Sequence, residues 1–368
     1  MAAQRQMRKT RIVCISDTHG QTPKLPKGDV LIHAGDLTNQ GGFEELQKTA
    51  AWLEKADFEA KIVVAGNHDI TLDAPFFREY GSSRPYPRPQ DPDQCRKLFT
   101  ESKSITYLEN EAATIYLTDS QGPYTSFKVF GSPSTPKVSN WAFQYTPSEA
   151  PKLWSAIPPD TDIVVTHTPP KGHRDKATKD NRVGCEFLLN ALHRVRPILA
   201  VCGHIHEARG VECVRWNDFL TSSRNGGLVK DVQGWEDPGA GEGNKKQSLV
   251  NLSVKGGRRL GNQGRLTCGG GTACGGQPDV PEILQPVPVL KSTSRPAVDN
   301  EARASGGTFE YQGSSGVDDI ELREGDVDDI ERKETVVINA AFLGPRIDRK
   351  TTHMNKPIVV DVDLPTWS

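Results

Sequence analysis

The chain has 368 residues, and its 45 Lys and Arg nearly balance its 47 Asp and Glu, leaving a formal net charge of −2. We therefore expect no binding of bulk nucleic acid and no broad attraction to a membrane surface. Hydrophobic residues make up 35% of the chain, diluted by 34 Gly and 26 Pro. This composition excludes collagen, a coiled coil and a wholly disordered chain, and it indicates a core plus a long polar stretch.

The start of the chain and its cysteines favour an intracellular protein. No apolar run approaches the ~20 residues of a membrane span. The apolar run at residues 12–15 follows a charged segment and is too short for a signal peptide. Seven cysteines without a tight spacing pattern fit reduced thiols. We predict a cytoplasmic location, with the nucleus as the alternative.

Five short runs of Val, Ile and Leu predict strands that are buried on both faces. In chain order they cover residues 12–15, 30–33, 61–64, 162–165 and 198–201. Two stretches with apolar residues at helical spacing, 43–55 and 187–195, lie between some of them. The alternation predicts an α/β sheet covered by helices, in which ligand sites collect beyond the carboxyl ends of the strands.

Residues 217–333 differ in composition from the chain before them. They hold 20 of the 34 Gly and only four aromatic residues, so they bury too little apolar area to offset their chain entropy. We predict a low-complexity, disordered insertion, preceded by a strand at 211–216 and followed by strands at 335–341 and 357–363. The folded domain would then comprise residues 10–216 and 334–368.

The insertion contains a short acidic repeat, at residues 317–321 and 327–331, in which Val-Asp-Asp-Ile-Glu occurs twice. Charge blocks of this kind are usually solvated chain. The alternative is a docking motif for a protein partner.

Each of the five predicted strands ends in a cluster of polar residues. Five of the nine His fall in these clusters, with Asp and Asn beside them. A lone His after a strand is more often a packing residue, so the prediction depends on the joint pattern. Imidazole with carboxylate and amide oxygens, and no thiolate, suits Mn, Fe or Zn. Two such cations about 3.5–4 Å apart would activate a water and hold phosphate oxygens. The candidate residues are Asp17, His19, Asp36, Asn67, His68, His167, His204 and His206.

The order and spacing of these motifs resemble the signature of the calcineurin-like metallophosphoesterase superfamily. The motifs are Asp17-x-His19, Gly35-Asp36, Gly66-Asn67-His68-Asp69, His167 and Gly203-His204-x-His206. Flanking residues at 17–20, 166–175, 203–207 and 338–340 resemble its metallophosphoesterase-domain-containing (MPPED-like) subgroup. The resemblance covers about residues 10–216 and 334–368. It implies a four-layer α/β/β/α sandwich that holds two divalent metal ions, with Mn expected first and Fe or Zn as alternatives.

The resemblance also implies a role for each motif residue. The first metal would be bound by Asp17, His19 and His206. The second metal would be bound by Asn67, His167 and His204, and Asp36 would bind both metals. His68 would stay off the metals and stabilise or protonate the leaving oxygen. Asp69 would hydrogen-bond His68 and set its tautomer. A hydroxide that bridges the two metals would attack phosphorus.

We therefore expect a phosphodiesterase that acts on a small substrate of the cyclic nucleotide type, and the resemblance alone carries this substrate class. A phosphoprotein or phosphomonoester phosphatase is one alternative, and it would need basic residues such as Arg174, Arg182 and Arg209 to grip a dianion. A nucleotide-binding scaffold with weak catalysis is the other. Residues 173–175 are candidates for substrate contact or for a solvated turn, and Trp141 for base stacking or for packing.

Overall fold

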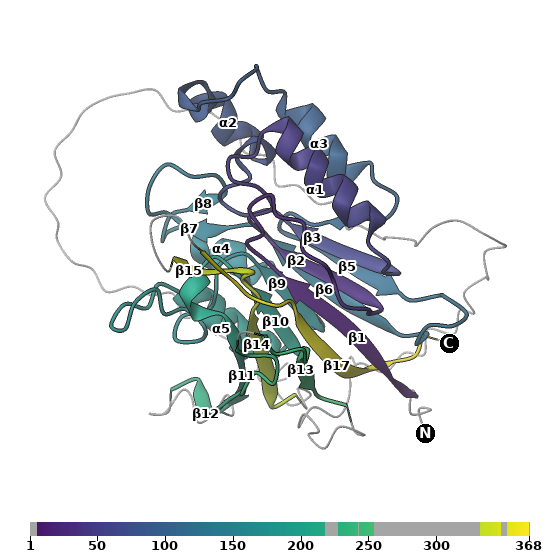
Figure 1. Ribbon diagram of the computed structural model, residues 1–368. Coiled ribbons are helices and arrows are strands. Elements are labelled where there is room, and N and C mark those ends of the chain that lie inside the picture. Colours follow the sequence, from purple (N-terminus) through teal and green to yellow (C-terminus); the bar gives the residue numbers. More distant parts are fainter. Residues whose placement is uncertain (1–5, 218–226, 242, 254–331, 347–351, 368) are drawn as a thin grey trace, which may run out of the picture.

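The computed structural model describes residues 6–217, 227–241, 243–253, 332–346 and 352–367 (Figure 1). Two sheets lie face to face, and helices cover the outer face of each. The first sheet has six strands in the order β13-β17-β1-β2-β3-β4. Their bounds are β1 (Met7–Ile15), β2 (Val30–Ala34), β3 (Ala60–Val64), β4 (Thr106–Tyr107), β13 (Ser248–Asn251) and β17 (Ile358–Pro365).

The strands of the first sheet run in two directions. β1 to β4 are parallel, whereas β17 runs antiparallel to β1 and carries β13 parallel to itself. The carboxyl ends of β1, β2 and β3 therefore meet at one edge, as expected for a sheet of parallel strands.

The second sheet has seven strands in the order β12-β11-β14-β10-β9-β6-β5. Its four central strands, β14, β10, β9 and β6, are parallel, and the outer strands β5, β11 and β12 are antiparallel to their neighbours. The bounds are β5 (Glu111–Tyr116), β6 (Ser126–Ser132), β9 (Ile163–Thr166), β10 (Leu199–Cys202), β11 (Gly210–Trp216), β12 (Val229–Gly234) and β14 (Glu334–Asn339). Two small pairs accompany it: β7 (Thr135–Pro136) with β8 (Gln144–Tyr145), and β15 (Leu343–Arg346) with β16 (Thr352–Met354).

Helices cover both outer faces of the sandwich. They are α1 (Phe43–Lys55), α2 (Ala74–Tyr80), α3 (Pro92–Thr100), α4 (Ala150–Ser155) and α5 (Glu186–Val195). Figure 1 shows α1 and α3 on the side of the first sheet and α4 and α5 on the side of the second. Among the described residues, no helix has both the length and the apolar character that a bilayer crossing requires.

Side-chain alternation along β1 explains the layers. Ile12 and Cys14 face the core between the two sheets, while Val13 and Ile15 face α1, where they meet Leu46 and its apolar neighbours. A strand sends successive side chains to opposite faces, so a continuous apolar run supplies two cores at once. The α/β sandwich of four layers, α/β/β/α, is thereby confirmed.

The predicted insertion needs a correction in its first part. Within residues 217–333, the described segment 227–253 contains β12 and β13, one at the end of each sheet. Val250 and Leu252 enter the core between the sheets, and the indole N–H of Trp235 donates to the Leu249 carbonyl at 3.3 Å. A composition averaged over the whole stretch hides these short apolar runs. The rest of the predicted insertion, at 218–226, 242 and 254–331, lies outside the described residues, and the acidic repeat is part of it.

Candidate metal centre

The predicted ligands lie just beyond the carboxyl ends of five strands. Asp17 and His19 follow β1, Asp36 follows β2 and Asn67 follows β3 in the first sheet, while His167 follows β9 and His204 and His206 follow β10 in the second. Backbone hydrogen bonds join the loops of the first sheet, from the Asp17 N–H to the Gly35 carbonyl at 2.9 Å and from the His19 N–H to the Asp36 carbonyl at 3.1 Å. Both sheets thus contribute ligands to one site.

The backbone of these loops is strained. Asp17, His19, Asp36 and His204 have φ values of 54°, 45°, 51° and 67°, a region that residues with a Cβ rarely adopt. Each such residue costs on the order of 1–3 kcal/mol, and such strain persists only when surrounding contacts hold it. The strain falls on four of the predicted ligands, as is typical of a functional site.

A first group of donor atoms comes from Asp17, His19, Asp36 and His206, whose ligand atoms lie within 4.8 Å of one another. His206 Nε2 is 3.4 Å from Asp17 Oδ1, and His19 Nε2 is 3.6 Å from Asp36 Oδ2. The two imidazole nitrogens, His19 Nε2 and His206 Nε2, face each other at 3.3 Å. A divalent cation held by these four side chains would satisfy the lone pairs of both nitrogens and both carboxylates, so the donor set fits one metal.

A second group comes from Asp36, His167 and His204, again within 4.8 Å. His167 Nε2 lies 3.3 Å from Asp36 Oδ1 and 3.2 Å from the amide oxygen of Asn67. His167 Nδ1 donates to the Ala34 carbonyl at 2.8 Å, which directs Nε2 into the site as a metal ligand requires. These donors fit a second metal.

Asp36 belongs to both groups, and each of its carboxylate oxygens faces one of them. Oδ2 is directed toward His19 and Oδ1 toward His167. The carboxylate is 3% exposed and also accepts the His68 N–H through Oδ1 at 2.9 Å. The carboxylate of Asp36 could therefore serve a cation in each group of donors.

Buried charges shift the pKa values within the site. Burial acts to raise the pKa of Asp36, but the charges of His167 and His19 outweigh it and hold that pKa well below its usual value. Burial lowers the pKa of His204 to about 4, so its imidazole is neutral and available as a ligand at neutral pH. His167 is also buried, yet the charge of Asp36 raises its pKa to about 9. A cation that binds His167 must displace this proton, which links metal binding to pH.

Two glycines are required by close approach of the ligands. A Cβ at Gly66 would overlap the backbone nitrogen and Oδ1 of Asp36, and a Cβ at Gly203 would overlap Oδ2 of Asp17. Neither glycine has a positive φ. Glycine in the motifs Gly66-Asn67 and Gly203-His204 therefore leaves room for the carboxylates of Asp36 and Asp17 beside the backbone, and any larger residue would displace a predicted ligand.

The predicted hydrogen bond between Asp69 and His68 is wrong. The Asp69 carboxylate accepts the N–H groups of Leu37, Thr38 and Gly66 at 3.1, 2.9 and 2.8 Å and the Thr38 hydroxyl at 2.7 Å. It is fully buried, and burial together with the charge of Asp36 raises its pKa to about 7. Asp69 therefore fastens the loop after β2 to the loop after β3 and has a structural role.

His68 takes its orientation from a backbone carbonyl instead. Its Nδ1 donates to the Asn39 carbonyl at 2.8 Å, and its ring lies 4.8 Å from the ring of His19. His68 thus lies beside the first group of donors, and the hydrogen bond to Asn39 uses Nδ1 and leaves Nε2 out. No sequence signal could have indicated Asn39, because the contact uses a main-chain oxygen that every residue carries.

Asn339 is a further residue whose role the sequence did not reveal. Its amide donates to the carbonyls of Ile205, Arg174 and Gly203 at 2.9, 3.2 and 3.3 Å, and its oxygen accepts the Ala341 N–H at 3.1 Å. Asn339 thereby holds the loop that carries His204 and His206. Its place in the motif at 338–340, far from the ligands in sequence, was the one available signal.

Residues 173–175 do not form a solvated turn. His173 Nδ1 lies 2.6 Å from Glu212 Oε1, and Arg174 Nε lies 3.2 Å from Glu212 Oε2. The buried Asp175 accepts the Gly172 N–H at 2.8 Å. These contacts hold the loop to β11, so the polar groups of residues 173–175 are used in its structure.

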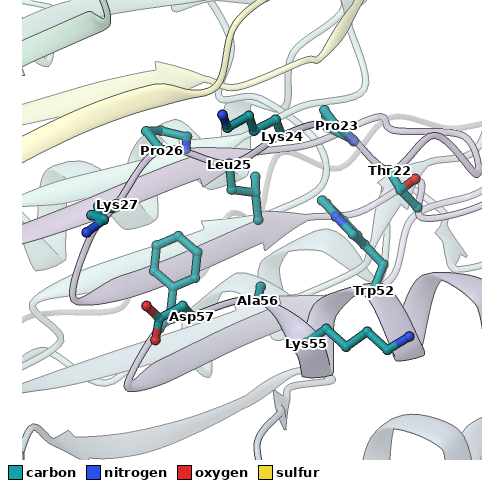
Figure 2. A pocket seen from close by; sticks show the side chains of 11 residues that line it. Thr22, Pro23, Lys24, Leu25, Pro26, Lys27, Trp52, Lys55, Ala56 and Asp57 are labelled. Carbon is teal, nitrogen blue, oxygen red and sulfur yellow. The ribbon is translucent and has the colours of Figure 1, made fainter.

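A separate cavity lies away from the metal ligands, between residues 22–27 and the end of α1. It is open to solvent and has a volume of about 400 Å³, and Figure 2 shows the side chains around it. Leu25, Trp52 and Phe58 supply apolar surface, and Lys24 and Lys27 are among the polar residues of its lining. It contains none of the predicted site residues.

The model of a protein family described as "Calcineurin-like phosphoesterase" matches residues 10–208. The chain belongs to the calcineurin-like phosphoesterase family. The matched region is a metal-dependent phosphoester hydrolase domain of the dinuclear type, and the two groups of donor atoms that share Asp36 agree with this.

Two curated proteins similar to this calcineurin-like chain carry different names. The chain is 40% identical over 226 residues to the human metallophosphoesterase domain-containing protein 1, and the aligned region covers 58% of this chain and 66% of that protein. The chain is 44% identical over 209 residues to a probable rhamnogalacturonate lyase C of Emericella nidulans, and the aligned region covers 56% of this chain but 18% of that protein. The chain thus spans less than two thirds of the length of either relative.

Solved structures similar to this calcineurin-like chain match it weakly. A purple acid phosphatase from yellow lupin seeds has a TM-score of 0.29 at 13% identity, covering 58% of this chain and 40% of that one. The protein TT1561 of Thermus thermophilus has a TM-score of 0.35 at 16% identity, covering 54% and 82%. The family assignment depends on the family model alone.

Proposed function

We propose that this phosphoesterase is a phosphodiesterase that hydrolyses a small, cyclic nucleotide-type diester with two divalent cations, of which Mn²⁺ is the first candidate. The observation that carries the proposal is the shared position of Asp36 between two groups of imidazole and carboxylate donors, with His68 directly beside them. We further propose that the protein acts in the cytoplasm, and that the acidic repeat at 317–331, outside the described residues, serves a protein partner.

The donor set indicates what the site would do chemically. Bound there, two divalent cations would lower the pKa of a water shared between them to near neutrality and neutralise phosphate oxygens. Asp36 sets the separation of the two ligand groups because one carboxylate serves both. Asp17 accepts the His204 N–H at 3.0 Å and so ties the two groups of ligands together.

His68 is placed to act on the leaving oxygen. Its Nδ1 proton is held by the Asn39 carbonyl, so only the imidazolium form also carries a proton at Nε2. From there it would donate to the leaving alkoxide as the ester bond to phosphorus breaks. General-acid assistance of this kind contributes about 10²–10⁴-fold in rate.

The arginines favour a diester over a monoester substrate. A dianionic monoester would need cationic side chains beyond the metals. The three candidates from the sequence are ion-paired elsewhere: Arg174 with Glu212, Arg182 with Asp175 at 2.8 Å and Arg209 with Asp237 at 2.9 Å. A diester carries one negative charge fewer, so its binding does not require these arginines.

The test is an assay with Mn²⁺ on bis-p-nitrophenyl phosphate, p-nitrophenyl phosphate and a panel of cyclic nucleotides. We expect preference for diesters, a fall of at least about 10³-fold in Asp36→Asn because an amide cannot serve two cations, and a fall of about 10²–10⁴-fold in His68→Ala. Asp160→Asn, which removes a half-exposed carboxylate paired with Lys128, is the matched control.

Three outcomes would contradict the proposal in different ways. Wild-type turnover in Asp36→Asn would mean that hydrolysis takes place outside the described centre. Faster hydrolysis of the monoester would favour the phosphatase. Nucleotide binding without turnover on any diester would favour the scaffold.

A further inference from the structure

The loop between β7 and β8 brings one aromatic side chain against His68. The indole of Trp141 and the imidazole of His68 have ring centroids 4.2 Å apart, with 32° between their planes. The neighbouring aromatics face elsewhere: Phe143 packs against the core between the first sheet and its helices, and Tyr145 packs against Trp154 with ring centroids 5.7 Å apart. Trp141 thus contacts the residue that we propose as general acid.

Backbone hydrogen bonds hold the loop that carries Trp141, and one cation lies over its indole. The N–H of Ala142 donates to the carbonyl of the predicted metal ligand Asn67 at 3.3 Å, so the loop is attached to the segment that carries His68. Arg84 donates to the Asn140 carbonyl at 2.5 Å, and its guanidinium carbon lies 4.9 Å from the centroid of the Trp141 ring. A cation over an indole face is held there electrostatically. Trp141 is therefore a fixed surface.

His68 needs such a surface. One hydrogen bond, from Nδ1 to the Asn39 carbonyl, holds a single atom of the imidazole, and the ring can still tilt about that contact. The broad, two-fold torsion of a histidine ring adds to this freedom. A flat neighbour whose ring centroid lies 4.2 Å away restricts the tilt, because the two restraints together define the plane of the ring.

We propose that Trp141 is a positioning residue that holds the His68 imidazole in the plane from which Nε2 reaches the leaving oxygen. The inference builds on the proposed function, because it takes His68 as the group that acts on the leaving oxygen. Arg84 acts one step further out, by holding the indole. Misplacement of a reacting group by about 1 Å can cost about 10²-fold in rate, so loss of the indole should lower kcat and leave the metal ligands in place.

The experiment measures kcat and KM with Mn²⁺ and bis-p-nitrophenyl phosphate for Trp141→Ala, Trp141→Phe, His68→Ala and the double variant Trp141→Ala/His68→Ala. We expect Trp141→Ala to lower kcat about 10–100-fold with KM within about threefold, and Trp141→Phe to restore most of the loss. In the His68→Ala background, Trp141→Ala should cost less than about twofold, because it acts through His68.

Two further variants keep the test decisive. Arg84→Ala should lower kcat by about two- to fivefold, again only where His68 is present. This variant replaces Trp141→Ala in the test if Trp141→Ala fails to fold. Trp367→Ala removes another tryptophan at the surface, whose indole donates to the Leu117 carbonyl at 2.9 Å, and should leave kcat unchanged.

The outcomes separate this inference from the function on which it builds. A rise in KM with kcat preserved in Trp141→Ala would overturn it and indicate that the indole stacks on the substrate. An equal loss with and without His68 would overturn it as well. Wild-type activity in His68→Ala would instead overturn the proposed role of His68 itself.

Discussion

The two ends of the parallel strands treat buried charge in opposite ways. At the carboxyl ends, Asp17 and Asp36 gather with imidazoles on strained backbone, and their lone pairs point at one another. At the amino ends, the buried guanidinium of Arg332 donates to Asp162 and to the Thr161 carbonyl at 2.8 Å. The chain satisfies the second set by itself, whereas the first set is arranged for cations from outside. Stability and function are thereby placed at different ends of the same sheets.

The largest effect on this comparison should come from Arg332→Met. The change leaves the carboxylate of Asp162, 2% exposed, without its guanidinium. Breaking a buried pair by removing one partner costs about 3–5 kcal/mol in the free energy of unfolding. Urea titration measures it, with Arg78→Met on the exposed face of α2 as the control that should stay within about 0.5 kcal/mol. A loss of Mn²⁺ affinity with unchanged stability would show that the two ends are not separate.

Metal removal tests the carboxyl ends. Cations that bind the folded state alone should stabilise it by about 2.7 kcal/mol at a concentration one hundred times Kd. We expect chelator-treated protein to unfold at lower urea concentration and to recover on addition of Mn²⁺. Asp36→Asn should lose most of this gain, since both groups of donors share that carboxylate. An equal gain in Asp36→Asn would place the stabilising ion elsewhere.

The smallest effect should come from Asp361→Asn, away from the metal ligands. Arg11 on β1 lies opposite Asp361 on β17 and donates to both of its oxygens at 2.7 and 2.8 Å. Because the Arg11 side chain is 32% exposed, water screens the pair, and we expect a loss of about 1–2 kcal/mol at pH 7.

The pH dependence of this loss follows from the pKa of Asp361. Burial acts to raise that pKa, but the hydrogen bond and charge of Arg11 outweigh it and hold it below its usual value. A lowered pKa stabilises the folded state above the unfolded value, near pH 4, and this contribution disappears as pH falls through the folded value. Urea titrations at pH 7 and at decreasing pH should therefore show wild type and variant converging in acid. A constant difference would mean that the carboxylate charge plays no part.

Much of the site could be predicted from the sequence because its signals are local. A buried parallel strand is a continuous apolar run, and the residues that follow it are bound to meet the ends of its neighbours. The seven predicted ligands, from Asp17 to His206, accordingly lie together at one edge of the sandwich. The boundaries of the insertion were less predictable, since β12 and β13 are short and sit in a stretch of low average hydrophobicity.

The sequence by itself thus determined a sheet covered by helices, the ligand types and the edge at which they meet, and the resemblance to a family added the four layers. Tertiary structure alone decided that Asp69 turns away from His68, that the Asn39 carbonyl orients His68, that Asn339 secures the loop of His204 and His206, and that Trp141 packs on the His68 ring. The physical reason is that these contacts join segments distant in the chain through main-chain atoms and ring faces. Such groups leave no periodic or spaced pattern in a sequence.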